Sequence, residues 1–188
     1  MKNLIAVILA SGLAGWSVHA QGTVQFANLN VAAGVNAPVY HADGIRRVSG
    51  PAWLTELMAG PNSTSLAQIA NTTFLTGGGA GYFDGGSQAI ATVPGGGTAW
   101  IQLDIWDSTL GGTTTGATLA QAQASGLYDV WVQTGVFSEI TGDPNAIPAT
   151  PPAPLTGLGT SSIFVPEPSA LSLAGLGLAG LLLFRRRK

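Results

Sequence analysis

The 188-residue sequence contains no cysteine, which excludes disulfide bonds and thiolate chemistry. Histidine is almost as scarce, because only His19 and His41 are present and His19 lies in an N-terminal segment that we expect to be removed. A zinc site built from cysteine and histidine is therefore excluded. A Ser-His-Asp triad would have to use His41, which stands alone in the stretch VYHADG, a context more typical of a loop.

Positive charge is also scarce between the two ends of the chain. Five of the seven lysines and arginines lie in the terminal segments, so only Arg46 and Arg47 accompany the eight acidic residues between positions 21 and 165. This region has a formal charge of −6 and no lysine. Nucleic-acid binding needs cations clustered on one face, so we expect no nucleic-acid partner.

The N-terminal segment has the layout of a secretory signal. Lys2 precedes an apolar run from Leu4 to about Trp16, and the small residues Val18 and Ala20 follow it. The run has about 13 residues, fewer than the roughly 20 that span a bilayer. We therefore predict a signal peptide at residues 1–20, which signal peptidase removes before Gln21.

The C-terminal segment contains an uncharged run from Ser169 to Phe184. These residues would form a helix about 24 Å long, which is marginal for a hydrocarbon core of about 30 Å. Snorkelling arginine stems extend its reach, and prolines suit the first turn of a helix. We predict a transmembrane helix over about 169–184, with the basic end, residues 185–188, on the cytoplasmic side.

Three features in this order form a recognisable pattern: a Pro-Glu-Pro motif, an apolar helix and a basic cluster. The pattern resembles the PEP-CTERM sorting signal. The resemblance implies recognition by exosortase, a membrane cysteine transpeptidase, with removal of the tail near the motif and delivery to the cell surface or extracellular matrix. The sorting residues are Val165, Pro166, Glu167, Pro168, Arg185, Arg186, Arg187 and Lys188. Short proteins with this tail often begin with a G-x-V-x-F-x-N pattern, matched here by Gly22, Val24, Phe26 and Asn28.

Between the ends, short stretches rich in Val, Ile, Thr and Trp alternate with glycine clusters that indicate turns. This pattern predicts an all-β fold, a single small sandwich or jelly-roll-like domain with one or two short helices. A helix is expected at 117–124, and residues 65–70 are a second candidate. The expected strands are 23–27, 52–59, 87–93, 98–106, 128–137 and 161–165. We divide the chain into the signal peptide, a body at 21–141, a Pro-rich surface loop at 142–160, a last strand at 161–165 and the sorting tail at 166–188.

The stretch WIQLDIWD is the best candidate for a binding surface. Alternate residues of a strand share a face, so the aliphatic residues 101, 103 and 105 should point to the core. The opposite face and the stretch DVWVQ could then form one patch. Its candidate residues are Trp100, Gln102, Asp104, Trp106, Asp129, Trp131 and Gln133. Indole faces stack on sugar rings and carboxylates bind hydroxyls, so this is a candidate glycan-binding platform; the alternative is that the tryptophans only pack.

Other chemistry has weaker support in the sequence. Asp104 and Asp107 fall on opposite faces of a strand, so they make a poor glycosidase pair. Aspartates in turns suit calcium but commonly cap their own backbone, and no EF-hand loop is present. The candidates are Asp43, Asp84, Asp107 and Asp143. We assign no catalytic residue, metal or cofactor.

The leading functional hypothesis is an exported, non-enzymatic protein with a structural or interaction role at the cell surface or in the matrix. Its precursor would be anchored in the inner membrane and its partners would be exosortase, signal peptidase and the membrane. A carbohydrate-binding module that takes an extracellular polysaccharide is the alternative. A small glycan-active enzyme is the third hypothesis.

Overall fold

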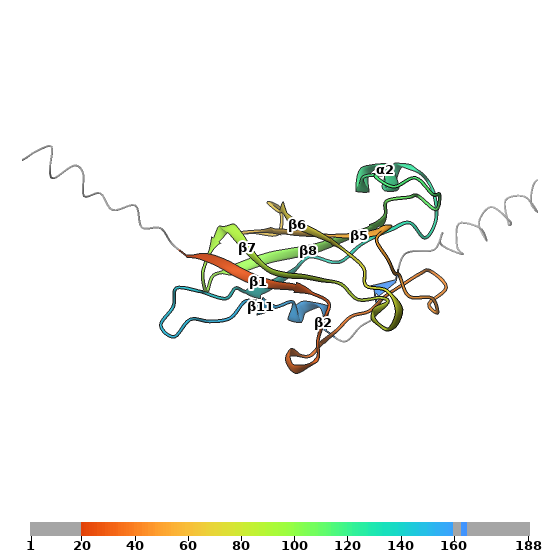
Figure 1. Cartoon of the computed structure of the whole chain (residues 1–188). Coiled ribbons are helices and arrows are strands. Elements are labelled where there is room, and N and C mark those ends of the chain that lie inside the picture. Colours follow the sequence, from red (N-terminus) through yellow and green to blue (C-terminus); the bar gives the residue numbers. More distant parts are fainter. Residues whose placement is uncertain (1–19, 160–162, 165–188) are drawn as a thin grey trace, which may run out of the picture.

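The structure, a computed structural model, describes residues 20–159 and 163–164 and consists mainly of strands (Figure 1). The predicted all-β class is confirmed. The strands are β1 (Gln21–Ala27), β2 (Leu29–Asn30), β3 (Val35–Asn36), β4 (Val39–Tyr40), β5 (Trp53–Gly60), β6 (Ala67–Thr73), β7 (Asp84–Pro94), β8 (Thr98–Asp107), β9 (Trp131–Gln133), β10 (Phe137–Ile140), β11 (Ala153–Pro154) and β12 (Ile163–Phe164). The helical pieces are α2 (Leu119–Ala124) and the 3-10 turns η1 (Val31–Ala33), η2 (Gly77–Gly79) and η3 (Thr156–Leu158).

Two larger sheets make up the body. One has the order β10-β8-β5-β6, with β9 also paired to β8, and the other has the order β11-β1-β7. The chain passes from one sheet to the other between β7 and β8, in a tight turn where Gly96 adopts a φ of 72°. Two short pairs, β4 with β12 and β2 with β3, lie outside these sheets. Within the described residues, no helix is both long and apolar enough to cross a membrane.

Both sheets contribute to one hydrophobic core. Val24 and Phe26 of β1 and Ile90 of β7 are fully buried in the same cluster as Ile101 and Leu103 of β8. Each aliphatic or aromatic side chain buried in this way stabilises the fold by about 1.5–3 kcal/mol. The alternation of buried and exposed residues along β8 therefore fixes which of its faces remains outside.

Asn28, directly after β1, links other segments of the backbone through hydrogen bonds. Its side-chain amide donates to the carbonyl oxygens of Ala37 (2.8 Å) and Gly81 (2.9 Å), and its amide oxygen accepts from the backbone N–H of Phe83 (2.8 Å). The side chain is fully buried. Gly22, at the other end of the G-x-V-x-F-x-N pattern, is also constrained, because a Cβ there would lie 2.3 Å from the hydroxyl oxygen of Thr141. In this chain, the residues of the pattern therefore serve close packing and the hydrogen bonding of buried backbone groups.

The two expected helices had different outcomes. The helix predicted at 117–124 is present as α2, where Thr118 and Gln121 form a capping box and Ala122 is buried. The helix considered at 65–70 is wrong, since residues 67–73 form β6 and pair antiparallel with β5. Six residues are too few to sustain a helix without tertiary support, and the neighbouring strand offers a full ladder of hydrogen bonds instead.

The strand predicted at 128–137 is interrupted. Asp129 has a φ of 59°, incompatible with an extended strand, and the sheet residues are divided between β9 and β10. Between these two strands Thr134 still exchanges hydrogen bonds with Leu103, through its backbone N–H and its hydroxyl oxygen. The interruption is therefore a bulge in an edge strand beside β8, and it contains Gly135.

The Pro-rich segment contributes an edge strand to the smaller sheet, which has the order β11-β1-β7. Its residues Ala153–Pro154 form β11, which pairs in parallel with β1. The last expected strand, 161–165, is represented by β12, while residues 160–162 and 165 lie outside the described residues. The boundaries drawn between signal, body, loop and tail remain predictions.

Candidate functional site

Strand β8 places four of the predicted site residues on the outer face of the larger sheet. The odd-numbered residues of β8 between 99 and 105 are fully buried, so its even-numbered residues point the other way. These are Trp100, Gln102, Asp104 and Trp106. Strand β5 pairs beside them and places Glu56 opposite Asp104. We call Gln102, Asp104, Gln133 and Glu56 the polar patch.

Asp104 is the centre of the polar patch. Its Oδ1 accepts hydrogen bonds from the side-chain amides of Gln102 (3.0 Å) and Gln133 (2.9 Å). Gln133 reaches it because β9 pairs with β8 in a register that sets Gln133 opposite Asp104. Asp104 is only 5 % exposed. Burial raises the pKa of its carboxyl, while the two amide donors act in the opposite direction.

Glu56 was not predicted as a site residue. It lies across from Asp104, and burial followed by repulsion from that carboxylate raises its pKa. Two carboxylates facing each other on a sheet make a demanding arrangement, since like charges in opposite positions destabilise a strand pair. The period-2 pattern of WLTELMA indicates the face on which Glu56 lies, but nothing in the sequence reveals that β5 is the neighbour of β8.

Two of the three candidate tryptophans serve packing. Trp106 is 6 % exposed and forms a second apolar cluster with Ala122 of α2 and Val130, against which Trp131 packs. Its indole N–H donates to the carbonyl oxygen of Ala117 at 2.8 Å. The register also pairs Trp106 directly with Trp131, so the structure brings these residues together beside α2.

Trp100 has a different environment. It is half-buried near the other end of β8, opposite Gly60 of β5 and Ser138 of β10. It lies six positions before Trp106 in the strand, a distance of about 20 Å. The three indoles therefore do not form one continuous stacking surface, and Trp100 is the one that borders the polar patch away from α2.

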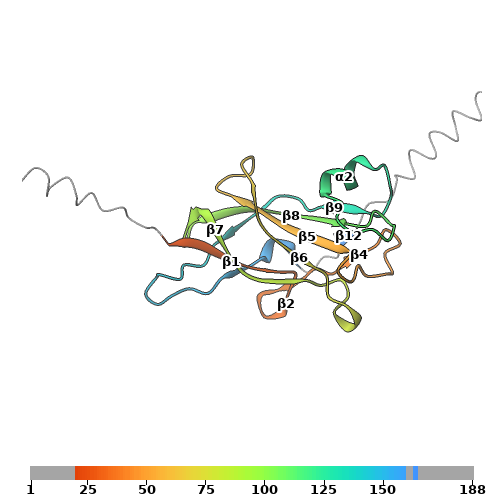
Figure 2. The ribbon, with the colours of Figure 1, turned by 45° about the horizontal axis from the view of Figure 1, so that its top comes forward.

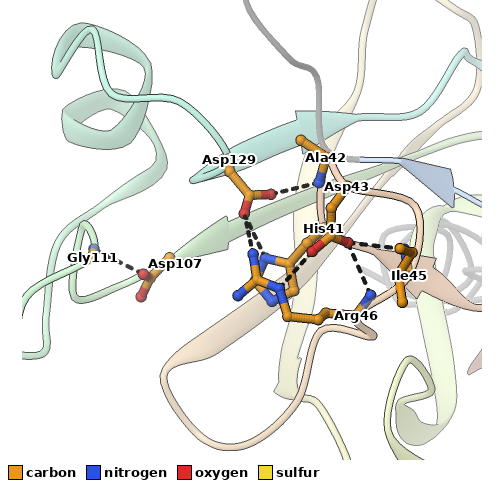
Figure 3. Close-up of polar contacts among 8 residues, drawn as sticks. All are labelled: His41, Ala42, Asp43, Ile45, Arg46, Asp107, Gly111 and Asp129. Atoms are coloured by element: carbon orange, nitrogen blue, oxygen red, sulfur yellow. Dashed lines mark hydrogen bonds and ion pairs between the residues drawn. The ribbon is translucent and has the colours of Figure 1, made fainter.

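Asp129 does not share a face with Trp131 and Gln133, which corrects the prediction. It precedes β9 in a left-handed conformation, and its carboxylate accepts from the backbone N–H of Ala42 (2.8 Å) and contacts Nδ1 of His41 (2.7 Å; Figure 3). The indole of Trp53 packs edge-on against the His41 ring. Among the described residues, no serine or threonine hydroxyl is hydrogen-bonded to His41, so the contacts present join two loops.

The turn aspartates considered for calcium bind their own backbones. Asp107 accepts from the N–H groups of Thr109 and Gly111, and the latter bond is visible in Figure 3. Asp43 accepts from the N–H groups two and three residues ahead of it, and hydrogen bonds from Arg46 and those N–H groups lower its pKa to about 2. Asp84 and Asp143 likewise accept from the N–H two residues ahead. In the part of the chain described, no three Asp, Glu or His side chains gather around a common point.

The predicted processing residues lie almost wholly outside the described residues. Val18, residues 165–168 and residues 185–188 are among those not described. Ala20 and Gln21 are described: Gln21 begins β1, and the carbonyl oxygen of Ala20 accepts from the N–H of Gly95. The predicted signal-peptidase bond thus falls where the first strand begins.

The C-terminal sequence places the chain among exported proteins that an exosortase system sorts. The family model for the PEP-CTERM protein-sorting motif matches residues 164–188, which confirms the recognition based on the Pro-Glu-Pro motif, the apolar run and the basic end. The chain is thus an exosortase substrate, exported and membrane-anchored before processing. No curated protein and no solved structure matches the chain.

Proposed function

We propose that the exported body has a non-enzymatic, structural or interaction role at the cell surface or in the extracellular matrix, and that its two sheets form a small sandwich. The observation that carries this proposal is that most side chains considered for binding or catalysis are occupied by contacts within the protein itself. Trp106 is buried beneath α2, the turn aspartates cap their own loops and His41 is held by Asp129. Such contacts fit a displayed domain whose polar residues maintain its loops.

Intact mass spectrometry of the protein from its host tests the sorting part of this proposal. Membrane, surface and medium fractions are measured separately. We expect a mature species that begins at Gln21 and ends near Pro166–Pro168. A chain that still ends at Lys188 and stays in the membrane fraction would instead make the tail a permanent anchor. Polysaccharide hydrolysis that is lost in Asp104→Asn or Asp107→Asn would contradict the non-enzymatic role.

The second candidate function is carbohydrate binding through the polar patch and Trp100. One observation favours it: a carboxylate pre-oriented by two amides lies on the same sheet face as a half-buried indole. Sugar hydroxyls bind such fixed polar groups, and sugar rings stack on indoles.

Trp100→Ala, measured on a glycan array, tests this candidate, with Trp100→Phe as the matched control that keeps a flat aromatic face. Binding lost in the first variant and retained in the second supports the glycan site. Absence of wild-type binding to every glycan removes it. Trp106→Ala is unsuitable for this purpose, because it would disturb the packing of α2.

A further inference from the structure

The sorting motif leaves the body at one defined end. Strand β12 pairs in parallel with β4, with Phe164 opposite Tyr40, and the matched motif begins at Phe164. Figure 2 shows β4, β12 and α2 together at this end, while β1 begins at the opposite end. The tail therefore departs next to the loop that follows Tyr40.

Exposed apolar side chains lie on the two loops at this end. Ile45 is 83 % exposed at the tip of the first loop, and Leu127 and Tyr128 (64 % exposed) lie on the second. Asp129 holds these loops side by side through its contacts with His41 and with the N–H of Ala42. We call Ile45, Leu127 and Tyr128 the tail-proximal surface.

The connection between this end and the apolar run is short. Only residues 165–168 separate β12 from Ser169, where the run begins. Four extended residues reach about 14 Å at most. The headgroup layer on each side of the hydrocarbon is about 5–8 Å thick. With Ser169 at the edge of the hydrocarbon, this connection holds the end of β12 no more than about 6–9 Å beyond the headgroups.

We propose that the tail-proximal surface rests on the lipid headgroup layer while the precursor is anchored. Tyrosine is enriched at this depth of membranes, and an aliphatic tip gains from partial burial there. Charge adds no attraction here, because the single guanidinium of Arg46 faces two carboxylates: it pairs with Asp43 and lies 3.8 Å from Asp129 (Figure 3). This proposal rests on the membrane-anchored precursor and adds the orientation of the body on the membrane.

Site-specific labelling of the anchored precursor, the chain from Gln21 to Lys188, tests the proposal. Because the chain has no cysteine, Ile45→Cys provides a single site for an environment-sensitive fluorophore. Ile147→Cys is the matched control: Ile147 is fully exposed on the Pro-rich segment, whose first residue Gly142 bonds to Thr23 near the start of β1, at the opposite end. Each labelled chain is reconstituted into phosphatidylethanolamine–phosphatidylglycerol vesicles containing headgroup-level spin-labelled lipid.

We expect quenching at position 45 to exceed that at position 147 by about twofold or more, because only the former lies within the interface. Equal, weak quenching in vesicles that carry the floated chain overturns the proposal and leaves the transpeptidase as the partner of this surface. A chain that fails to float with vesicles overturns the anchoring itself. Leu176→Arg, which interrupts the apolar run, should abolish the difference; a difference that persists would refute the role of the short connection.

Discussion

The substitution Trp106→Ala distinguishes a packing tryptophan from a ligand-binding one. Trp106 lies on the outer side of β8, yet its indole is covered by the segment that contains α2. It also supplies the hydrogen-bond partner of the Ala117 carbonyl, just before the capping box of the helix. Removal of the indole should therefore leave α2 without a surface on which to pack.

The expected cost follows from the area that the ring buries. A tryptophan buries about 150–250 Å², which at about 25 cal/mol per Å² corresponds to about 4–6 kcal/mol. Loss of the bond to Ala117 adds about 1 kcal/mol. A six-residue helix on the edge of the body can collapse partly into the space, so we expect a net loss of about 3–5 kcal/mol.

Urea unfolding of wild type, Trp106→Ala and Trp100→Ala measures this difference. Trp100→Ala should lower the free energy of unfolding by about 1 kcal/mol, which is the range that strand propensities span, because Trp100 is only half-buried. Unchanged m-values would show that the midpoint shift reports stability alone. A loss below about 1 kcal/mol for Trp106→Ala, when the burial argument requires at least about 3, would refute the packing role and return this indole to the candidate ligand surface.

Four further substitutions test other parts of the structure. The Thr55 hydroxyl is fully buried without a hydrogen-bond partner, so Thr55→Val should raise the unfolding free energy by about 1 kcal/mol in urea titration. The control Thr141→Val should lower it, because this change removes a hydroxyl bonded to the carbonyls of residues 94 and 97. Glu56→Gln should stabilise the protein at neutral pH but not below about pH 4. Folding raises the pKa of the Glu56 carboxyl, so the native state binds more protons than the unfolded state and the protein loses stability as pH rises. Equal gains at both pH values would contradict this. Asn28→Ala should cost about 3 kcal/mol or more by thermal or urea unfolding, because it leaves the carbonyl of Ala37 and the N–H of Phe83 unpaired, whereas the Gly81 carbonyl keeps its bond from Val39. A smaller loss would show that water replaces the amide.

Local patterns in the sequence predicted the elements whose own residues determine them. The period-2 alternation of residues 98–106 gave the buried and outer faces of β8, and the Gly-flanked run at 117–124 gave α2. The same reasoning failed at residues 65–70, where pairing with β5 outweighed a weak helical preference. It also failed at Asp129, whose left-handed backbone is fixed by contacts with a loop 87–88 positions earlier.

The candidate site depends on pairings that no local pattern contains. Gln133 meets Asp104 and Glu56 faces it only because β9 and β5 flank β8 in particular registers. A shift of one residue in either register would turn these side chains to the other face of the sheet. The sequence could therefore indicate the residue types of the polar patch, but not its fourth member or the burial of Trp106.

The orientation proposed for the precursor affects how the polar patch could be used. Strand β8 ends at Asp107, near Ala52 and the loops of the tail-proximal end, while Trp100 lies towards its start beside β10. With the tail-proximal surface on the membrane, the Trp100 end of the sheet would be the part of the body farthest from the lipid. A ligand bound there would be accessible both before and after the tail is removed. Glycan binding by the full chain in vesicles should therefore match that in detergent solution, and binding that appears only in solution would place the site, rather than the loops, against the membrane.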